Sequence, residues 1–313
     1  MATLLYRGSV QAHTKAVTSI KSFPSNPLAF ISSARDNKAV VWELDINSDD
    51  IALPIREFGK HNNAISDVAV FPDGQYVLTC SWDATARLHR VSDGESIAHL
   101  IGHKKDIFCG AFGVGGRCIM TAGRDRSICV WNVNGDLTYH LDGVHNDWIN
   151  AIAYKPSQET QGGMFVTGSS DCTCSVWKLE PGEDGDLSFN QIASLVGHTG
   201  PITCVGFSAD GTIIATGARD KKVYLWNSDS LEIVSSIPVE EDVLDLKFSA
   251  MNNLLAVCTP TSVKIWNLLE FQLVDTINAD EEHGKFTCVE WNTDSTALLV
   301  GCTDGSIRGY QNE

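Results

Sequence analysis

The sequence lacks the features that identify several classes of protein. No apolar run reaches the roughly 18 residues that a membrane-spanning helix needs. The N-terminus has no basic stretch followed by an apolar one, which is the pattern of a secretory signal. We therefore expect a cytoplasmic protein with no membrane span. Neither a Gly-x-Ser-x-Gly nucleophile turn nor a glycine-rich phosphate loop occurs in a strand–turn–helix context, so we expect no enzymatic activity, no small-molecule substrate and no cofactor.

The ten cysteines lack the spacing of a metal site or of a disulfide framework. Most of them fall inside predicted strands, where a thiol in a reducing compartment acts as a small buried apolar side chain. The only close pair, Cys172 and Cys174, has a single residue between its members, and the paired spacing typical of zinc sites is missing. We expect no bound metal.

Positive charge is also scarce. The chain has 23 Lys and Arg against 39 Asp and Glu, which gives a formal net charge of −16 at pH 7. This balance argues against a general nucleic-acid-binding surface. The acidic residues gather in predicted loops, at 45–50, 180–186, 240–242 and 280–282, where they are typical of solvated connections. The position of the few bases is therefore more informative than their number.

The sequence does contain a stretch that it repeats, clearest between Gly197 and Asn227. β-Branched and aromatic residues predict strands at 202–207, 213–218 and 223–226, and a fourth strand at 232–237. Tight polar turns separate them. Four short antiparallel strands leave two apolar faces uncovered, so the unit must stack on copies of itself.

The copies are recognised by three polar residues and a tryptophan. In each unit a His precedes an Asp by about 22 positions, a Ser or Thr stands four positions before that Asp, and a Trp stands six positions after it. The complete sets are His13, Ser32, Asp36 and Trp42 in the first unit; His103, Thr121, Asp125 and Trp131 in the third; His145, Thr167, Asp171 and Trp177 in the fourth; and His198, Thr216, Asp220 and Trp226 in the fifth.

Three further units are incomplete. The departures are His89 in place of Trp in the second unit, which retains His61, Thr79 and Asp83; Ala256 and Pro260 in the hydroxyl and Asp places of the sixth, which retains Trp266; and Val300 and Tyr310 in the hydroxyl and Trp places of the seventh, which retains His283 and Asp304. The sixth unit has none of the three polar residues. We therefore expect it to open most easily.

Seven units in 313 residues average about 45 residues each, the period expected of four-stranded propeller blades. We predict an all-β, seven-bladed β-propeller that forms a single domain over 1–313. The last unit ends too early to supply a fourth strand, so the N-terminal segment 1–10 should complete it and close the ring. The predicted repeats are approximately 11–52, 59–99, 101–141, 143–195, 196–237, 238–277 and 281–313.

The repeated pattern resembles the WD-repeat family. The resemblance implies that the His, Ser or Thr, Asp and Trp of each unit form a buried hydrogen-bonded tetrad. Such a network is physically reasonable, because buried polar groups are tolerated only when they satisfy one another.

Particular segments are similar to a narrower family, the receptors for activated C kinase. They are SSARDNKAVVWEL in the first unit, SWDATARL in the second, GHKKDIFCGAF and TAGRDRSICVWN in the third, HNDWINAIAYKPS in the fourth and GHTGPITCVGFSADG in the fifth. The resemblance implies a non-enzymatic scaffold on the small (40S) ribosomal subunit, which contacts rRNA and ribosomal proteins and links translation to signalling proteins such as protein kinase C.

The bases gather in the turns that carry the repeated Asp and just after the repeated His. The resemblance gives Arg35, Arg124 and Arg126 as candidate rRNA contacts. Further candidates are Lys38, which could compensate for Asn37, and Lys15 and Lys104, which follow the repeated His and could add phosphate contacts. The sequence departs from the family at Asn37, where the family has Lys, and it lacks the family's tyrosine after Phe248.

Two alternatives remain open from the residues alone. The bases could simply solubilise the turns, in which case the chain would be a WD-repeat adaptor of another complex, such as a ubiquitin-ligase substrate receptor. Trp82 and Trp148 stand beside these turns and are candidate contacts for partner proteins, but each could instead pack between neighbouring units.

Overall fold

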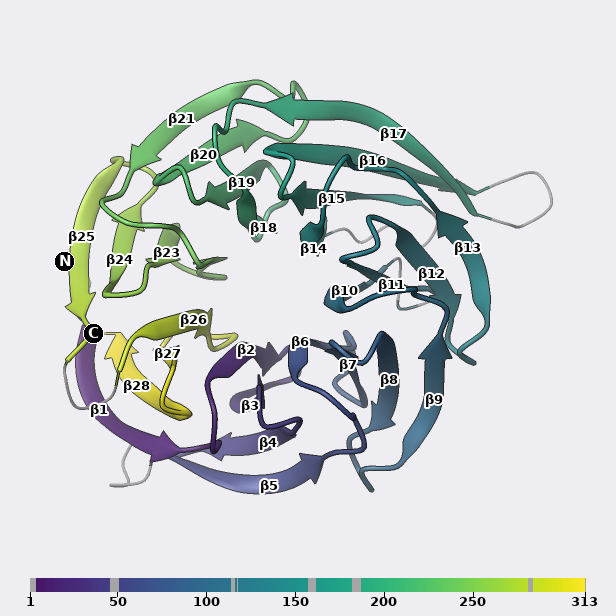
Figure 1. Cartoon of the computed structure of the whole chain (residues 1–313). Helices are drawn as coiled ribbons and strands as arrows, with labels where there is room; N and C mark the ends of the chain where they lie inside the picture. The colour runs from purple at the N-terminus through teal and green to yellow at the C-terminus, as the bar shows by residue number, and fades with distance from the viewer. Residues whose placement is uncertain are drawn as a thin grey trace.

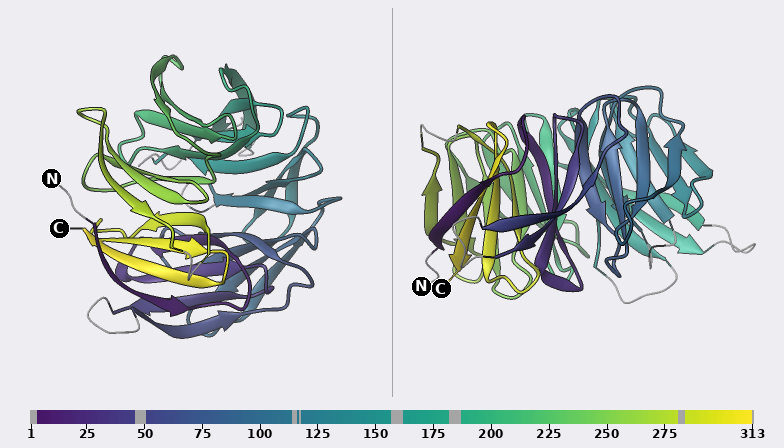
Figure 2. Two further views of the ribbon diagram at one scale, coloured as in Figure 1. Left: turned by 60° about the vertical axis from the view of Figure 1, so that its left-hand side comes forward. Right: turned by 90° about the horizontal axis from the view of Figure 1, so that it is seen from below.

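In the computed structural model, the chain forms a ring of seven four-stranded antiparallel sheets (Figure 1). The structure describes residues 4–45, 51–113, 116, 118–156, 162–181, 187–280 and 284–312. The predicted seven-bladed β-propeller is therefore confirmed. Viewed from the side, the blades make a disc with the strands inclined to its axis (Figure 2).

Six blades consist of four consecutive strands each. Blade 1 contains β2 (Val17–Phe23), β3 (Asn26–Ala34), β4 (Ala39–Leu44) and β5 (Ala52–Phe58); blade 2 contains β6 (Ile65–Val70), β7 (Tyr76–Ser81), β8 (Thr85–Arg90) and β9 (Ser96–Ile101); blade 3 contains β10 (Ile107–Phe112), β11 (Cys118–Gly123), β12 (Ile128–Asn132) and β13 (Leu137–Leu141). Blade 4 contains β14 (Ile149–Tyr154), β15 (Gly163–Ser169), β16 (Thr173–Pro181) and β17 (Leu187–Val196); blade 5 contains β18 (Ile202–Phe207), β19 (Ile213–Ala218), β20 (Lys222–Asn227) and β21 (Ile233–Pro238); blade 6 contains β22 (Asp245–Phe248), β23 (Leu254–Cys258), β24 (Ser262–Asn267) and β25 (Gln272–Asn278).

The two ends of the chain share blade 7. Its strands are β26 (Phe286–Trp291), β27 (Ala297–Cys302), β28 (Ser306–Asn312) and the N-terminal β1 (Leu4–Gln11), which pairs with β28 on the outer edge. The predicted closure by the N-terminal strand is confirmed. The rings of Tyr6 and Tyr310 pack 5.5 Å apart across this pairing. The pairing covers the edge of β28 and joins the two ends of the chain, so that β1 becomes the outer strand of blade 7.

A glycine allows blades 7 and 1 to approach closely. The backbone N–H of His13 donates to the Gly305 carbonyl at 2.9 Å. Gly305 has a φ of 92°, and a Cβ atom there would lie 2.2 Å from the His13 carbonyl oxygen. Only glycine fits this left-handed position without displacing the chain of blade 1.

The first strand of each blade faces the axis of the ring, and the last strand forms its outer surface (Figure 1). Apolar side chains of adjacent blades pack together between the sheets. One such cluster joins Leu88 and Leu100 of blade 2 to Trp131 of blade 3. No helix in the described part of the chain is long and apolar enough to cross a membrane.

Candidate functional site

Four blades bring their complete tetrads together. In blade 1, the Trp42 indole N–H donates to Ser32 Oγ at 2.8 Å, Ser32 Oγ lies 2.8 Å from His13 Nε2, and His13 Nδ1 lies 3.1 Å from Asp36 Oδ2. The same contacts span 2.8–3.1 Å in blades 3, 4 and 5. The His and hydroxyl side chains are buried. Every polar side chain in these tetrads therefore has a partner in the protein.

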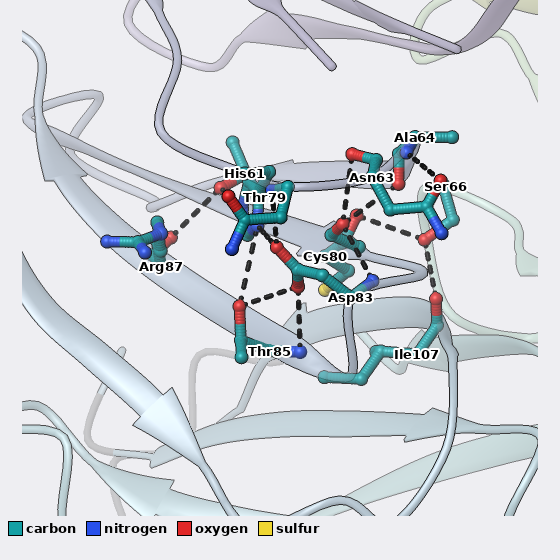
Figure 3. Close-up of polar contacts among 12 residues, drawn as sticks. His61, Asn63, Ala64, Ser66, Thr79, Cys80, Asp83, Thr85, Arg87 and Ile107 are labelled. Atoms are coloured by element: carbon teal, nitrogen blue, oxygen red, sulfur yellow. Dashed lines mark hydrogen bonds and ion pairs between the residues drawn. The ribbon is translucent and has the colours of Figure 1, made fainter.

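Blade 2 completes its network without a tryptophan. His89 Nε2 lies 3.2 Å from Thr79 Oγ1, which lies 2.8 Å from His61 Nε2. His61 Nδ1 in turn lies 2.9 Å from Asp83 Oδ2 (Figure 3). A second imidazole thus stands in the place of the indole. The second unit lacks the Trp of the tetrad, as the sequence shows, but the repeat pattern did not predict the hydrogen bond of His89.

Ionisation in this network follows from its burial and its hydrogen bonds. Burial lowers the pKa of His89 to about 3, and burial also lowers the pKa of His61, although Asp83 opposes it. Burial alone would raise the pKa of Asp83. Hydrogen bonds from Thr85, the Asn62 backbone and His61 outweigh it and hold that pKa at about 2. At neutral pH the site is therefore a neutral imidazole pair beside a carboxylate.

Blade 6 lacks the network, and the sheet register corrects one sequence assignment. In blade 5, Ile214 pairs with Trp226, and the tetrad hydroxyl follows two residues later at Thr216. In blade 6, Leu255 pairs with Trp266, so the equivalent position is Val257 and not Ala256. The displacement arises because Trp266 follows Val257 by nine positions, whereas Trp226 follows Thr216 by ten. Among the described residues, the buried Trp266 Nε1 has no hydrogen-bond partner.

Blade 7 also departs from the tetrad. His283 lies outside the described residues, and Asp304 Oδ1 accepts hydrogen bonds from the backbone N–H and hydroxyl of Ser306. The buried Arg308 donates to Asp280 at 2.6 Å and lies over the ring of Phe286. A buried cation with a carboxylate partner therefore occupies this blade, which the repeat pattern did not predict.

The tetrad Asp also determines the shape of the turns that carry the bases. In blade 1, the carboxylate of Asp36 accepts the backbone N–H groups of Thr14 and Lys38 at 3.0 and 3.1 Å. In blade 3, Asp125 accepts that of Lys104 at 2.9 Å. Each tetrad Asp thus ties the turn in front of the inner strand to the turn between the second and third strands. These turns lie on one face of the disc, which we call the tetrad face.

The six candidate bases all lie exposed in turns of the tetrad face, but they differ in their partners. Lys38 pairs with Glu57 at 2.9 Å, and Arg124 pairs with Asp106 at 3.2 Å. The other four are Lys15, Arg35, Lys104 and Arg126, for which the described part of the chain offers no ion-pair partner. These four side chains are available to anions, whereas the two paired ones are partly neutralised.

The two candidate contact tryptophans each lie beneath an arginine of the preceding blade. The Arg35 guanidinium lies 5.3 Å from the ring centroid of Trp82, and that of Arg124 lies 5.0 Å from that of Trp148. Trp82 is half-buried, and Trp148 is 42% exposed while packing edge-on against Phe108. Each ring therefore packs against a neighbouring blade and still presents surface to solvent, and a contact of these rings with a partner protein stays a prediction. Each arginine–tryptophan contact joins two neighbouring blades, so the sequence of a single repeat could not predict it.

Cavities lined by described residues of the inner strands follow one another along the axis of the ring. On the tetrad face, a cavity of about 670 Å³, here called the mouth, is lined by residues at or next to the start of every inner strand. Its lining includes Arg35, Trp82, Phe108, Trp148 and Arg219. Cavities of about 130 and 400 Å³ follow along the axis.

The deeper cavities contain charged residues that the repeat pattern did not identify. Asp67 accepts hydrogen bonds from Ser19 in blade 1 and from the Gly110 backbone in blade 3. Asp245 similarly accepts the Val289 N–H of blade 7, and burial raises the pKa of Asp245. These carboxylates connect adjacent blades. In the described residues, no three His, Cys, Asp or Glu side chains are arranged to hold a metal ion.

Comparison with known proteins agrees with this architecture. The model of the WD domain, G-beta repeat, matches residues 5–43, 53–90, 94–132, 136–178 and 189–227, and that of the anaphase-promoting complex subunit 4 WD40 domain matches residues 246–313. The small ribosomal subunit protein RACK1 of Candida albicans is 32% identical over 98% of this chain and 96% of its own length. The protein of the same name from Caenorhabditis elegans is 30% identical over 97% and 95%.

A third relative carries a different name. The cross-pathway control WD-repeat protein 2 of Flammulina velutipes is 30% identical over 97% of this chain and 96% of its own length. All three similarities extend across the seven blades rather than over a few repeats. The chain therefore belongs to the WD-repeat β-propellers and, among them, to the RACK1 family.

Proposed function

We propose that this protein is a non-enzymatic scaffold of the small ribosomal subunit, held there by the bases of its tetrad face. The observation that carries the proposal is the nearly full-length similarity to relatives named as small ribosomal subunit proteins. In this proposal the whole chain acts as one domain, and its location is cytoplasmic and ribosome-associated.

The distribution of charge supports docking on rRNA. The chain has a net charge of −16, yet Lys15, Arg35, Lys104 and Arg126 project from one face without ion-pair partners among the described residues. Phosphate contacts of this kind position a protein without reading base sequence. An acidic body with a localised basic face favours one orientation on a polyanion.

The departure at Asn37 is compatible with this role. Asn37 has a φ of 70°, and the equivalent residues after the Asp of blades 2 to 5 have φ values of 64–69°. Asparagine tolerates this left-handed conformation better than most residues. The substitution removes one positive charge but retains the turn that presents Arg35 and Lys38.

The remaining surface would receive signalling proteins such as kinases, protein kinase C among them, and thereby connect them to translation. The second candidate is an adaptor of another complex, for example a ubiquitin-ligase substrate receptor. The ion pairs of Lys38 and Arg124 with carboxylates favour this candidate. The charges of these two bases are already partly neutralised within the protein, so the turns do not need RNA phosphates as partners.

Sucrose-gradient sedimentation of a cell extract distinguishes the two candidates. The scaffold should sediment with the small subunit at physiological salt and be released at high salt, since phosphate contacts weaken steeply as salt rises. Sedimentation at the top of the gradient at low salt, together with recovery in one non-ribosomal complex, would support the adaptor instead.

A further inference from the structure

We infer that the axial channel binds a small aromatic carboxylate at the end that lies away from the tetrad face. The site is the cavity of about 400 Å³, here called the distal cavity. The residues that line it include none of the six candidate rRNA contacts and none of the residues that line the mouth. The inference therefore goes beyond the ribosomal role and does not depend on it.

The distal cavity lies where the inner strands end. The last residues of β10, β14, β18 and β22 line it, namely Phe112, Tyr154, Phe207 and Phe248. Because the inner strands begin at the tetrad face, these residues lie at the opposite face of the disc. The volume of about 400 Å³ is within the range of roughly 300–1,000 Å³ that is common for ligand pockets.

Two lysines reach the distal cavity, and only one of them has a counterion. Lys247 Nζ lies 3.1 Å from Glu290 Oε2. Burial opposes the charge of Lys247, but Glu290 and Asp245 outweigh burial and raise the pKa of Lys247. Lys21 lies close enough to Lys247 for the two side chains to interact. Within the described part of the chain, no carboxylate lies within ion-pair distance of the Lys21 ammonium group, which is therefore available to an anion.

The carboxylates that line the distal cavity are already engaged elsewhere. Asp67 accepts the Ser19 hydroxyl and the backbone N–H groups of Val68 and Gly110 at 2.8–3.1 Å. Glu290 Oε1 accepts the Ser22 hydroxyl at 3.2 Å, while Glu290 Oε2 faces Lys247. Both acids also repel further negative charge. A singly charged carboxylate therefore fits beside Lys21 better than a doubly charged phosphate.

The wall opposite these charges favours a flat apolar body. The charged residues belong to blades 6, 7, 1 and 2, whereas blades 3 to 5 contribute Phe112, Ile152, Tyr154, Val205 and Phe207. Tyr154 and Phe207 are only partly buried, so part of each ring is open to an occupant. Aromatic side chains make favourable offset and edge-to-face contacts with other rings. An ammonium group across from an aromatic wall is the arrangement that an aromatic carboxylate requires.

Isothermal titration calorimetry with 2-naphthoate at pH 8 tests the inference. The matched ligands are 2-naphthamide, which keeps the rings but has no charge, and 2-naphthyl phosphate, which carries a second charge. We expect saturable binding of one 2-naphthoate per chain and weaker binding of the phosphate. Binding of the amide should be at least about tenfold weaker, because it lacks the charge-assisted hydrogen bond to Lys21.

Two variants test the two walls of the cavity separately. Lys21→Met keeps the apolar stem and removes the charge. It should weaken binding of 2-naphthoate at least about tenfold but leave that of 2-naphthamide unchanged. Phe207→Leu keeps an apolar side chain but removes the ring, and it should weaken binding of both ligands. The thermal midpoint of Lys21→Met should stay near or above that of the wild type, because the charge that it removes has no counterion.

Two control variants locate the binding. Lys178→Met removes an equal charge from an exposed side chain of blade 4, and Arg35→Ala alters the mouth. Both should bind 2-naphthoate like the wild type. Cosedimentation of Lys21→Met with small ribosomal subunits should also be normal, so failure of the ribosomal role would be visible separately.

Three results would overturn the inference. The first is the absence of saturable 2-naphthoate binding to the wild type. The second is equal affinity of the wild type for 2-naphthoate and 2-naphthamide. The third is binding that Arg35→Ala abolishes and Lys21→Met leaves intact, because the ligand would then occupy the mouth rather than the distal cavity.

Discussion

The imidazole of His89 takes the structural place of a tryptophan, with its Nε2 atom 3.2 Å from Thr79 Oγ1. Its Nδ1 atom is buried and has no partner among the described residues. A neutral ring with the proton on Nε2 fits this site, since a charged ring would bury a second N–H without an acceptor. The site therefore disfavours protonation of the folded protein.

This arrangement predicts acid sensitivity. The pKa of His89 is about 3 in the folded protein and 6.5 ordinarily, so the unfolded chain binds a proton first as the pH falls below 6.5. The contribution of neutral His89 to the free energy of unfolding is fully present above pH 6.5. It is lost as the pH falls toward 3, by up to about 1.4 kcal/mol per pH unit. The lowered pKa values of His13 and His61 act in the same direction.

Urea unfolding of wild type and His89→Gln between pH 7 and pH 4 measures this contribution. Glutamine keeps an N–H donor but has no ionisable group. We expect the free energy of unfolding to fall less steeply with decreasing pH in the variant. Parallel pH profiles would show that His89 does not titrate between the two states.

Blades 5 and 6 offer reciprocal tests of the tetrad hydroxyl. Thr216→Val removes the acceptor of Trp226 and the partner of His198, and we expect a loss of about 2 kcal/mol or more in the free energy of unfolding. Val257→Thr would give Trp266 an acceptor, with a gain of at most about 1 kcal/mol. Chemical denaturation compares both variants with the wild type. A larger loss from Val257→Thr than from Thr216→Val would contradict the register that places Val257 in the hydroxyl position.

The thiols provide a measure of blade opening. Nine of the ten cysteines are buried, and Cys172 is half-buried. Burial raises the pKa of Cys118 to about 11 and that of Cys129 to about 12, which suppresses the reactive thiolate. We expect at most one thiol to react with an aromatic disulfide reagent in the native protein, and none in Cys172→Ser.

Mass spectrometry of the labelled protein then tests whether blade 6 opens first. The next cysteine to react should be Cys258 of β23, because blade 6 lacks the tetrad. Hydrogen exchange should likewise be faster in β23 than in β19 of blade 5. Equal protection of the two strands would mean that apolar packing alone holds blade 6 closed.

The pair formed by Lys38 and Glu57 predicts a gain of ribosome affinity by mutation. Their charged atoms lie 2.9 Å apart, and both side chains are about half exposed, so the pair contributes little to stability. Glu57→Gln would release Lys38 and remove a negative charge from the tetrad face. We expect severalfold tighter binding to isolated small subunits and a steeper salt dependence. Unchanged affinity would place Lys38 outside the RNA contact.

Much of the architecture could be predicted because each blade repeats local signals. The predicted strand from Ile213 to Ala218 has the bounds that the structure shows, since β-branched residues and the flanking polar turns define it. Interactions between blades were harder to foresee. The stacking of Arg35 on Trp82 joins residues 47 positions apart, and no local pattern contains it.

The prediction that Ala256, rather than Val257, stands in the hydroxyl position of blade 6 was wrong for a similar reason. Counting back from Trp266 assumes a constant spacing of ten positions between the hydroxyl and the Trp, but that spacing is nine in blade 6, so only the pairing of β23 with β24 reveals the register. The use of His89 as a hydrogen-bond donor was readable in principle, because its ring can donate as an indole does. The ion pairs of Lys38 and Arg124 required the positions of neighbouring strands and turns.

The central claim is that unpaired bases of the tetrad face hold the protein on the small ribosomal subunit. Its most direct test is sucrose-gradient sedimentation of Lys15→Glu/Arg126→Glu beside the control Arg90→Glu/Lys178→Glu, which changes the net charge equally in side chains that pair with carboxylates. We predict that the first variant moves to the top of the gradient while still folded and that the control sediments with the small subunit like the wild type. Cosedimentation of both variants with the subunit would contradict the account.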